Sequence, residues 1–536
     1  MTENSKRILS LYMLFTVCFM AILVRIVYIN YTTYATAGKK QATRTVVVGT
    51  TRGKIYDRSM ELLVDESEKL IAAVTPVAET KKFLEPYFTQ ASLLSKIERG
   101  YPFVAPVKKV IDNELIKTFS VPVRYTPESP APHIVGYVDA SGRGVTGIEK
   151  AFEKELSAYN SKLSVTFEVN ALGRVLAGMD KTVKNEGFNS RGGVVLTLDK
   201  GLQKLTESVL KESEIESGCV IVSSAKTGEL LSLASVPRYS QSRVEDSLGK
   251  KNSPLVNKAL ESYSAGSVFK SVIAAFALES GISEDFRSEC KGKIKIGDKV
   301  FTCPGETAHG SLDMSGALQQ SCNLYFISLV NELDVSELLT FCRGLGFGRS
   351  LKLCEGIEGD SGILPDSMSL SSDGNRANFS FGQGDLLVTP VQMLTAYRAL
   401  ATGKVRAPQL VYGFCSSKGK ITPAQTKKDE TVLSEKTVTK MRQMLSDVTE
   451  KGIAVNARNS QLKLAGKTGT AESGIFDEDG KEILRTWFVG FFPYDEPRYI
   501  VTVMNEDGRG GNADCAPVFR KICEGIDRTA LDEAAD

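Results

Sequence analysis

The sequence has almost no excess charge, and this lack removes one class of partner. Its 66 Lys and Arg residues face 64 Asp and Glu residues, which leaves a net charge of +2. Nucleic-acid-binding chains need a basic surface, so no nucleic-acid partner is predicted. Internal repeats and low-complexity tracts are also absent. With 536 residues, 42% of them hydrophobic, the chain is long enough for two or three globular units.

The N-terminal residues are nearly all apolar. Within residues 8–30 only Arg25 carries a charge, and at about 1.5 Å per residue such a helix crosses a hydrocarbon core of about 30 Å. Lys6 and Arg7 precede the run, as the positive-inside rule expects of a cytoplasmic N-terminus. We predict a single transmembrane anchor with the rest of the chain outside the cytoplasm. A cleaved signal peptide is the alternative, because residues 35–37 have the small-x-small pattern of a cleavage site.

The cysteines do not suggest a simple disulfide framework. Nine of the ten follow the apolar segment, all except Cys18, and an odd number cannot pair completely. Several of them are therefore expected to be buried thiols or ligands of a metal ion.

Patterns along the rest of the chain predict two kinds of structure. Up to about residue 190 the sequence is polar and mixed, with a strand predicted over 133–138 and a helix over 147–156. Beyond it the elements are stronger and alternate in type, which predicts an α/β (α+β) layered domain with an antiparallel sheet flanked by helices. Its predicted elements are strands at 194–198, 219–223 and 229–234, a helix from about residue 200, a buried helix at 266–279, and strands at 462–467, 486–492 and 499–504.

The buried helix contains a candidate for covalent chemistry. Ser267 and Lys270 are three residues apart, which places them on one face of the helix, one turn apart. A serine hydroxyl needs a neighbouring group to take its proton, and a lysine among apolar residues becomes neutral enough to do so. The same spacing at 223–226 and at 417–420 falls in a hairpin turn and in a polar loop, where no buried helical face is expected.

Two further motifs follow this pair in the chain. Ser321-Cys322-Asn323 is the only Ser-x-Asn sequence, and Lys467-Thr468-Gly469-Thr470 lies at a predicted strand. Together the three motifs resemble the Ser-x-x-Lys, Ser-x-Asn and Lys-Thr-Gly set of penicillin-binding proteins. Further sequence blocks are similar to those of class B penicillin-binding proteins and follow that family's order: Arg52-Gly53-x-Ile55-x-Asp57-Arg58, Gly147-Ile148-Glu149, Asn257-Lys258-Ala259 and Phe381-Gly382-Gln383-Gly384.

The resemblance implies a penicillin-binding transpeptidase fold and an extended β-rich pedestal of the dimerisation type. The predicted organisation is a cytoplasmic tail over 1–7, a transmembrane anchor over 8–30, the pedestal over 31–190, the transpeptidase domain over 191–530 and a tail over 531–536. The implied partners are peptidoglycan stem peptides, β-lactam antibiotics, the membrane and a membrane glycosyltransferase. No organic cofactor is expected.

The resemblance also implies a role for each residue around the nucleophile. Ser267 would attack the penultimate D-Ala carbonyl of a pentapeptide stem and form an acyl-enzyme, with Lys270 as general base. Ser321 would relay protons, and Asn323 would hold the peptide amide and Lys270. An amine from a neighbouring stem would then take the acyl group.

The strand motif is implied to bind the substrate. Lys467 would supply positive charge, and Thr468 and Thr470 would hydrogen-bond the substrate carboxylate, with Gly469 between them in the same motif. The backbone N–H groups of Ser267 and Thr470 would form the oxyanion hole.

A candidate metal site lies beside these motifs. Cys290, Cys303, His309 and Cys322 follow one another with gaps of twelve, five and twelve residues, and three thiolates with one imidazole suit tetrahedral Zn(II). Because Cys322 is the middle residue of the Ser-x-Asn motif, such a zinc would be structural, and the resemblance here is to zinc-containing class B members. The alternatives are a Cys290–Cys303 disulfide or free thiols. The other histidine, His133, is assigned no chemistry.

Other functions remain open at this point. A β-lactamase has no use for an anchor and a pedestal, so it is disfavoured. A D,D-carboxypeptidase would differ only in using water as acceptor, and a mainly scaffolding role in elongation, division or sporulation would need only the anchor and pedestal. The intact triplet favours catalysis.

Overall fold

The computed structural model describes residues 3–31, 42–188, 190–477 and 479–535. The chain divides into two units, and each consists of several segments. The first unit comprises Met1–Arg52, Asp65–Arg124 and Tyr159–Ser190, and the second comprises Gly53–Val64, Tyr125–Ala158 and Arg191–Asp536.

Helix α1 (Glu3–Tyr31) is predominantly apolar. Its stretch Glu3–Ile29 is long and apolar enough to cross a membrane, and its described side chains are exposed. A helix with exposed Leu, Ile, Val and Phe side chains on every side is better suited to lipid than to water. The predicted anchor at 8–30 coincides with α1, whereas the alternative cleavage pattern at 35–37 lies outside the described residues.

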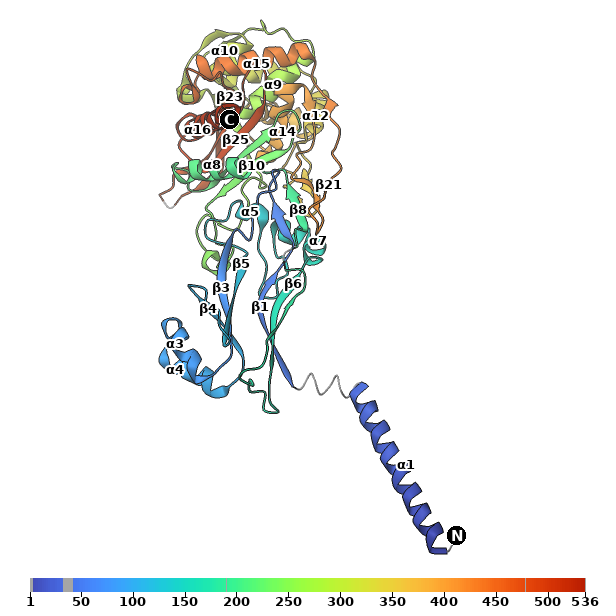
Figure 1. Ribbon diagram of the computed structural model, residues 1–536. Coiled ribbons are helices and arrows are strands. Elements are labelled where there is room, and N and C mark those ends of the chain that lie inside the picture. Colours follow the sequence, from blue (N-terminus) through green and yellow to red (C-terminus); the bar gives the residue numbers. More distant parts are fainter. Residues whose placement is uncertain (1–2, 32–41, 189, 478, 536) are drawn as a thin grey trace. The chain divides into compact units, whose positions relative to one another are not determined.

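The first unit is built around two antiparallel sheets (Figure 1). The first sheet has the order β1-β6-β7, with β1 (Thr43–Thr51), β6 (Ser161–Glu168) and β7 (Thr182–Asn185). The second has the order β4-β3-β5, with β3 (Ser67–Val74), β4 (Phe103–Val107) and β5 (Ile116–Val123), and helices α3 (Lys81–Leu84) and α4 (Gln90–Arg99) follow β3. Val48, Val121 and Phe167 pack in one small core, and Leu84 and Leu93 belong to another. The predicted β-rich extended domain is confirmed.

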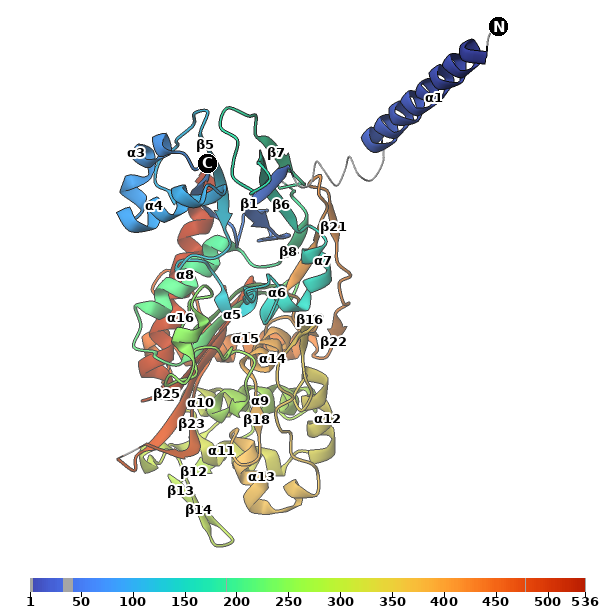
Figure 2. The ribbon, with the colours of Figure 1, turned by 90° about the horizontal axis from the view of Figure 1, so that it is seen from below.

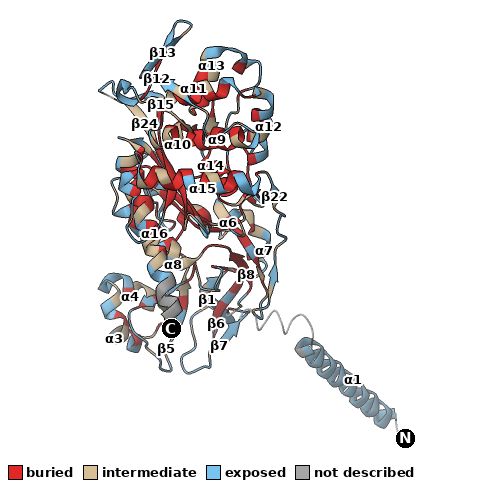
Figure 3. Ribbon diagram, turned by 90° about the horizontal axis from the view of Figure 1, so that it is seen from above, coloured by how far each residue is buried: buried red, intermediate tan, exposed pale blue. Residues whose placement is uncertain are grey.

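A five-stranded antiparallel sheet with the order β10-β9-β25-β24-β23 forms the centre of the second unit. Its strands are β9 (Gly218–Ser224), β10 (Leu230–Val236), β23 (Ala465–Phe476), β24 (Glu482–Phe492) and β25 (Tyr499–Gly508). Helices α8 (Lys200–Lys211) and α16 (Gly511–Ala535) lie on one side of it, and α9 (Lys270–Glu279), α14 (Pro390–Thr402) and α15 (Glu435–Glu450) lie on the other (Figure 2). Because helices cover both faces, the buried residues concentrate in this sheet and in α9 and α14 (Figure 3).

Smaller elements complete the second unit. A second sheet has the order β2-β8-β20-β21, with β2 (Lys54–Tyr56), β8 (Gly193–Leu196), β20 (Val411–Cys415) and β21 (Ile421–Pro423). The short strand pairs are β11 (Tyr263–Ser264) with β18 (Leu387–Val388), β12 (Ser288–Cys290) with β15 (Gly310–Leu312), β13 (Lys293–Ile296) with β14 (Lys299–Thr302), β16 (Lys352–Cys354) with β17 (Ile357–Glu358), and β19 (Lys404–Val405) with β22 (Glu430–Thr431). The other α-helices are α5 (Pro132–Val135), α6 (Gly147–Ala151), α7 (Glu153–Ser157), α10 (Met314–Gln319), α11 (Asn323–Asn331), α12 (Val335–Leu345) and α13 (Asp373–Ser380).

The structure divides residues 31–190 differently from the predicted single pedestal. Strand β2 pairs in parallel with β8, and Ile134 and Val135 are fully buried in the large core of the second unit. Residues 53–64 and 125–158 therefore belong to the second unit, because that is where their apolar side chains are buried.

Three predicted elements also differ in type or extent. Residues 133–138, predicted as a strand, begin within helix α5, where Pro132 fixes a φ suited to a first helical turn. The predicted helix at 147–156 is two helices, α6 and α7, separated at Phe152 with φ −115° and ψ 36°. Strand β23 begins at Ala465 and continues well past the predicted end. The remaining predicted strands and helices are confirmed.

Candidate active site

Ser267 lies at the start of a helix that neighbouring segments hold in place. The 3-10 turn η4 (Gly266–Phe269) leads directly into α9, so Ser267 precedes Lys270 by one turn. Gly266 has a φ of +60°, and a Cβ on it would lie 2.8 Å from the carbonyl oxygen of Thr470. Its N–H donates to the carbonyl of Gly382 at 2.8 Å. Glycine at this position therefore lets the nucleophile segment fit between β23 and the loop at Gly382.

Lys270 is fully buried behind the nucleophile. Its Nζ donates to the carbonyl oxygen of Ser321 and to Oδ1 of Asn323, both at 2.6 Å, and lies 3.3 Å from Oγ of Ser321. Burial lowers the pKa of Lys270 to about 7, against the opposing effect of the Cys322 and Cys303 thiols. A lysine with this pKa is partly neutral near neutral pH and can accept a proton.

Ser321 stands between two buried lysines. Nζ of Lys467 donates to Oγ of Ser321 at 3.0 Å and to the carbonyl of Thr468 at 3.1 Å. Burial, with the added effect of the Lys270 charge, holds the pKa of Lys467 well below its usual range. A hydroxyl oxygen has two lone pairs, and here both lysines approach that oxygen. The proton of Ser321 is therefore available to donate into the cleft.

The backbone of the Ser-x-Asn motif is held in an unusual conformation. Ser321 has a φ of +51°, the left-handed region that a residue with a side chain seldom adopts. Cys322 caps the N-terminus of α11, and its Sγ accepts from the N–H of Tyr325 at 3.4 Å. Nδ2 of Asn323 donates to the carbonyl of Thr302 at 2.7 Å. These contacts fix the strained Ser321 and Asn323 on either side of Cys322.

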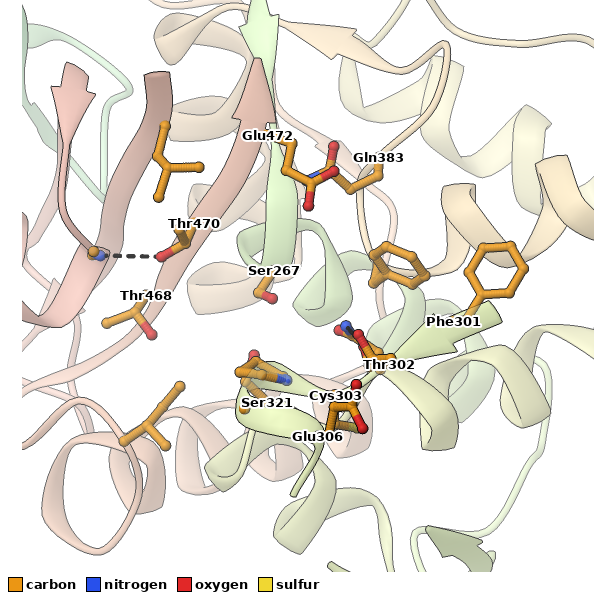
Figure 4. Close-up of a pocket in the computed structure, with 18 of the residues that line it drawn as sticks. Ser267, Phe301, Thr302, Cys303, Glu306, Ser321, Gln383, Thr468, Thr470 and Glu472 are labelled. Atoms are coloured by element: carbon orange, nitrogen blue, oxygen red, sulfur yellow. Dashed lines mark hydrogen bonds between the residues drawn. The ribbon is translucent and has the colours of Figure 1, made fainter. Parts of the chain in front are cut away.

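Of the predicted nucleophile and substrate-binding residues, Ser267, Thr468 and Thr470 line one open cleft with a volume of about 1110 Å³, and Gly469 does not. Ser267 and Ser321 lie at its centre, and Thr468 and Thr470 form one wall (Figure 4). Oγ1 of Thr470 accepts from the N–H of Gly511 at 3.3 Å, which fixes that hydroxyl at the start of α16. Lys270 and Lys467 are buried behind the cleft, as their hydrogen bonds to Ser321 require.

Part of the cleft was not predicted from the sequence. Hairpin strand β14, with the following residues to Glu306, supplies a second wall, and Gly510–Ala513 lies beside Thr470. The sequence predicts a short hairpin around Gly297-Asp298 between Cys290 and Cys303, which β13 and β14 confirm, but it does not indicate that this hairpin borders the cleft. Residues 510–513 carry no sequence motif beyond paired glycines. Only the fold brings them to the site, so the sequence does not indicate their place there.

The predicted metal ligands come together next to the Ser-x-Asn motif. Their four ligand atoms all lie within 4.8 Å of one another. Sγ of Cys303 is 3.6 Å from Sγ of Cys290 and 3.7 Å from Sγ of Cys322, and Nδ1 of His309 is 3.3 Å from Sγ of Cys290. Zn–S bonds of about 2.3 Å in a tetrahedron place sulfurs about 3.8 Å apart, so this donor set fits a zinc ion.

The chemistry of the thiols agrees with this geometry. The hydrogen bond between Cys322 and Cys303 is the largest cause that lowers the pKa of Cys303 to about 5, and it is also the largest cause that raises the pKa of Cys322, so the pair holds one proton and one thiolate. The thiolate is the form that binds a metal. None of the ten cysteines, all within the described ranges, is in a disulfide, and the 3.6 Å between Cys290 and Cys303 exceeds an S–S bond of about 2.05 Å. Five thiols outside the cluster are buried: Cys219, Cys342, Cys415, Cys515 and Cys523.

The residues set aside in the sequence lie away from the cleft. Ser223 lies within β9, one residue before its end, and residues 417–420 form the turn between β20 and β21. His133 donates from Nε2 to the carbonyl of Pro254 at 2.8 Å and packs edge-on against Tyr239. Burial lowers the pKa of His133 to about 4, so it is neutral near pH 7.

A serine and a buried lysine facing a Lys-Thr-Gly strand place the chain in the class of serine-type transpeptidases that penicillins acylate. The family model described as penicillin binding protein transpeptidase domain matches residues 218–524, more than half of the sequence. The chain belongs to this family.

Relatives match well beyond this domain. Penicillin-binding protein PbpB of Mycobacterium tuberculosis is 29% identical over 424 residues, which cover 74% of this chain and 60% of that protein. Stage V sporulation protein D of Bacillus subtilis is 25% identical over 567 residues, which cover 96% of this chain and 84% of that protein.

Solved structures show the same fold. Penicillin-binding protein 3 of Mycobacterium tuberculosis, solved in complex with aztreonam, aligns with a TM-score of 0.66 at 22% identity. The alignment covers 91% of this chain and 97% of that one. The predicted penicillin-binding transpeptidase fold is confirmed.

Proposed function

We propose that the chain is a membrane-anchored peptidoglycan D,D-transpeptidase that cross-links stem peptides in cell-wall synthesis and is acylated by β-lactams. The observation that carries the proposal is the place of Ser267 in an open cleft with Lys270 buried one helical turn away. Family membership supports the same reaction.

In the acylation step, Ser267 attacks the carbonyl carbon of the penultimate D-Ala. Lys270 takes the hydroxyl proton as the C–O bond forms, and the C–N bond to the terminal D-Ala breaks. Ser321 gives its proton to the leaving amine and recovers one from Lys270, whose Nζ lies 3.3 Å from its Oγ. Lys270 returns to its neutral form.

In the transfer step, an amine of a neighbouring stem attacks the ester. A C–N bond forms, the C–O bond to Ser267 breaks, and a proton from the amine returns to the Ser267 oxygen through Ser321 and Lys270. Water in place of the amine would give a D,D-carboxypeptidase. The cleft of about 1110 Å³ exceeds the usual range for one small ligand and supports a reaction of two peptides.

The strand wall recognises the donor. Thr468 and Thr470 donate hydroxyl hydrogen bonds to the terminal carboxylate of the stem, and Lys467 supplies positive charge from behind. The backbone N–H groups of Ser267 and Thr470 stabilise the oxyanion, a contribution whose loss typically lowers the rate about 100-fold or more. A β-lactam carries a carboxylate and a reactive amide, and takes the same place.

Intact-mass spectrometry of the full-length protein in detergent tests the nucleophile. After incubation with a β-lactam, the wild type should gain the mass of one antibiotic, and Ser267→Ala should gain none. Ser417→Ala removes the exposed serine of another Ser-x-x-Lys sequence and should behave as wild type. No adduct with any of several β-lactams would shift the proposal to a scaffolding role.

We also propose that Cys290, Cys303, His309 and Cys322 hold a structural zinc ion. The fit of their separations to a tetrahedron supports it. A metal bound to Cys322 would fix the backbone between Ser321 and Asn323, and so the strained φ of +51° at Ser321. The ion supplies no step of the reaction.

Elemental mass spectrometry tests the metal. One zinc per chain is expected in the wild type, with a clear loss in Cys290→Ser and none in Cys354→Ser, which changes a thiol outside the cluster. Protein without stoichiometric zinc and with two fewer free thiols than the sequence predicts would contradict the proposal and favour a disulfide.

The topology is proposed from the sequence. Lys6 and Arg7 support a cytoplasmic N-terminus, with α1 as the membrane anchor and the catalytic unit outside the cytoplasm. There the catalytic unit would meet a membrane glycosyltransferase that supplies glycan strands. A fluorescent β-lactam that cannot cross the membrane should label the protein in intact cells. Labelling only after the membrane is permeabilised would indicate the opposite orientation, with the catalytic unit in the cytoplasm.

A further inference from the structure

Glu472 continues the row of side chains that face the substrate. Side chains two residues apart on a strand point to the same face, and Thr468, Thr470 and Glu472 on β23 all line the cleft. Across the hairpin, Glu472 is in register with Leu484, which also lines the cleft. The carboxylate therefore lies in the active-site cleft, two positions beyond the proposed oxyanion residue.

This carboxylate has no partner within the described ranges. No hydrogen bond or ion pair there involves the side chain of Glu472, although that side chain is exposed to the cleft. The other acidic residue of the cleft, Glu306, is paired with Lys293 at 3.2 Å. An ionised carboxylate only accepts hydrogen bonds, so Glu472 is ready for a donor that the protein itself does not provide.

Gln383 faces Glu472 from the opposite wall. It lies between Gly382 and Gly384, whose φ values of +79° and +75° make a tight turn, and its N–H donates to the carbonyl of Asn378 at 3.0 Å. In Figure 4 the side chains of Glu472 and Gln383 turn toward each other beside the space in front of Ser267. Two groups able to accept hydrogen bonds thus converge from separate elements near the nucleophile.

We propose that Glu472, assisted by Gln383, binds the primary amine of the acceptor stem peptide. The inference rests on the proposed transpeptidase function, whose second substrate is an amine. The amine arrives as an ammonium ion, which the carboxylate attracts, and it loses one proton to solvent. The neutral amine still donates an N–H to the carboxylate and keeps its lone pair for attack on the ester carbon of acylated Ser267.

The partition of the acyl-enzyme between amine and water tests this assignment. Full-length protein is given a pentapeptide donor with an acetylated side-chain amine and an acceptor peptide with a free one. The ratio of cross-linked to hydrolysed product is independent of the acylation rate, because both products come from the same ester. In Glu472→Gln this ratio should fall about fivefold, because one accessible charge pair is lost. The difference in ratio between wild type and variant should become smaller at high salt, which screens that charge pair.

Glu482→Gln is the matched control. It neutralises an acidic residue on the same hairpin that lies outside the cleft lining, so its ratio should stay at the wild-type value. An unchanged ratio in Glu472→Gln, or an equal fall in both variants, would overturn the assignment. The assignment would also be overturned if Glu472→Gln were acylated more slowly than the wild type only by a donor with a free side-chain amine. In that case the carboxylate would bind the donor stem. Absence of any acyl-enzyme in the wild type would instead contradict the proposed function.

Discussion

Ser321 is the residue on which the proton path of this site depends. Its Oγ accepts from Lys467 at 3.0 Å and lies 3.3 Å from Nζ of Lys270, while its carbonyl accepts from Lys270 at 2.6 Å. Two fully charged lysines so close together would repel each other, and burial already lowers the pKa of both. The site therefore favours a state in which at least one lysine is neutral and able to receive the nucleophile's proton.

Replacing Lys270 tests its role as base. Lys270→Ala should slow acylation by a β-lactam by about 100-fold or more, the usual effect of a lost general base. Lys226→Ala removes the exposed lysine of another Ser-x-x-Lys sequence and should acylate as wild type. Rates come from the growth of the adduct mass with time. Equal rates in the two variants would exclude Lys270 as the base.

The pH dependence of acylation follows from the same pKa. Since the pKa of Lys270 is about 7, the lysine is protonated below that pH and cannot accept the proton of Ser267. The acylation rate constant should rise with pH through about 7 and fall about tenfold per unit on the acid side. Stopped-flow measurements with a chromogenic β-lactam would show it. A flat profile from about pH 5.5 to 8 would contradict the base assignment.

At the scale of elements, the turn η4 depends on a close approach to β23. Gly266→Ala should lower the free energy of unfolding by about 1–2 kcal/mol, because the backbone there is left-handed. The added Cβ would also lie 2.8 Å from the carbonyl oxygen of Thr470. This contact should displace Ser267 and slow acylation at least tenfold. Gly281 has a φ of +90°, but a Cβ added there would have no atom within 4 Å. Gly281→Ala should therefore lower stability without slowing acylation. Thermal melts and acylation rates on both variants would separate strain from displacement.

Which elements could be predicted depends on how local their causes are. The helix carrying Ser267 and the strands β9, β24 and β25 have strong apolar patterns, and their motifs follow a recognisable order. Residues 133–138 carry an apolar run that fits helix and strand equally, and the preceding Pro132 decides for a helix. The contact of Gly511 with Thr470 has no local signal, because it joins residues 41 positions apart.

At the scale of the whole molecule, His133 should make stability sensitive to acid. Its folded pKa of about 4 lies below the usual 6.5, so protonation favours the unfolded chain. The stability from neutral His133 is present above about pH 6.5 and is lost as pH falls toward 4. His133→Asn, which keeps an N–H donor, should make the denaturation midpoint depend less on pH over this interval. An equally steep decline in the variant would assign the acid sensitivity to other groups.

The chain passes between its two units five times, at 52/53, 64/65, 124/125, 158/159 and 190/191. The second unit, which contains the catalytic sheet, is thus encoded by two separate segments in the first third of the sequence as well as by the rest. A recombination event at residue 190 would transfer the downstream sequence without its own β2 and without its own buried Ile134 and Val135. Genetic exchange keeps the sheets of both units whole when the breakpoint precedes β1, which begins at Thr43 and pairs with β6.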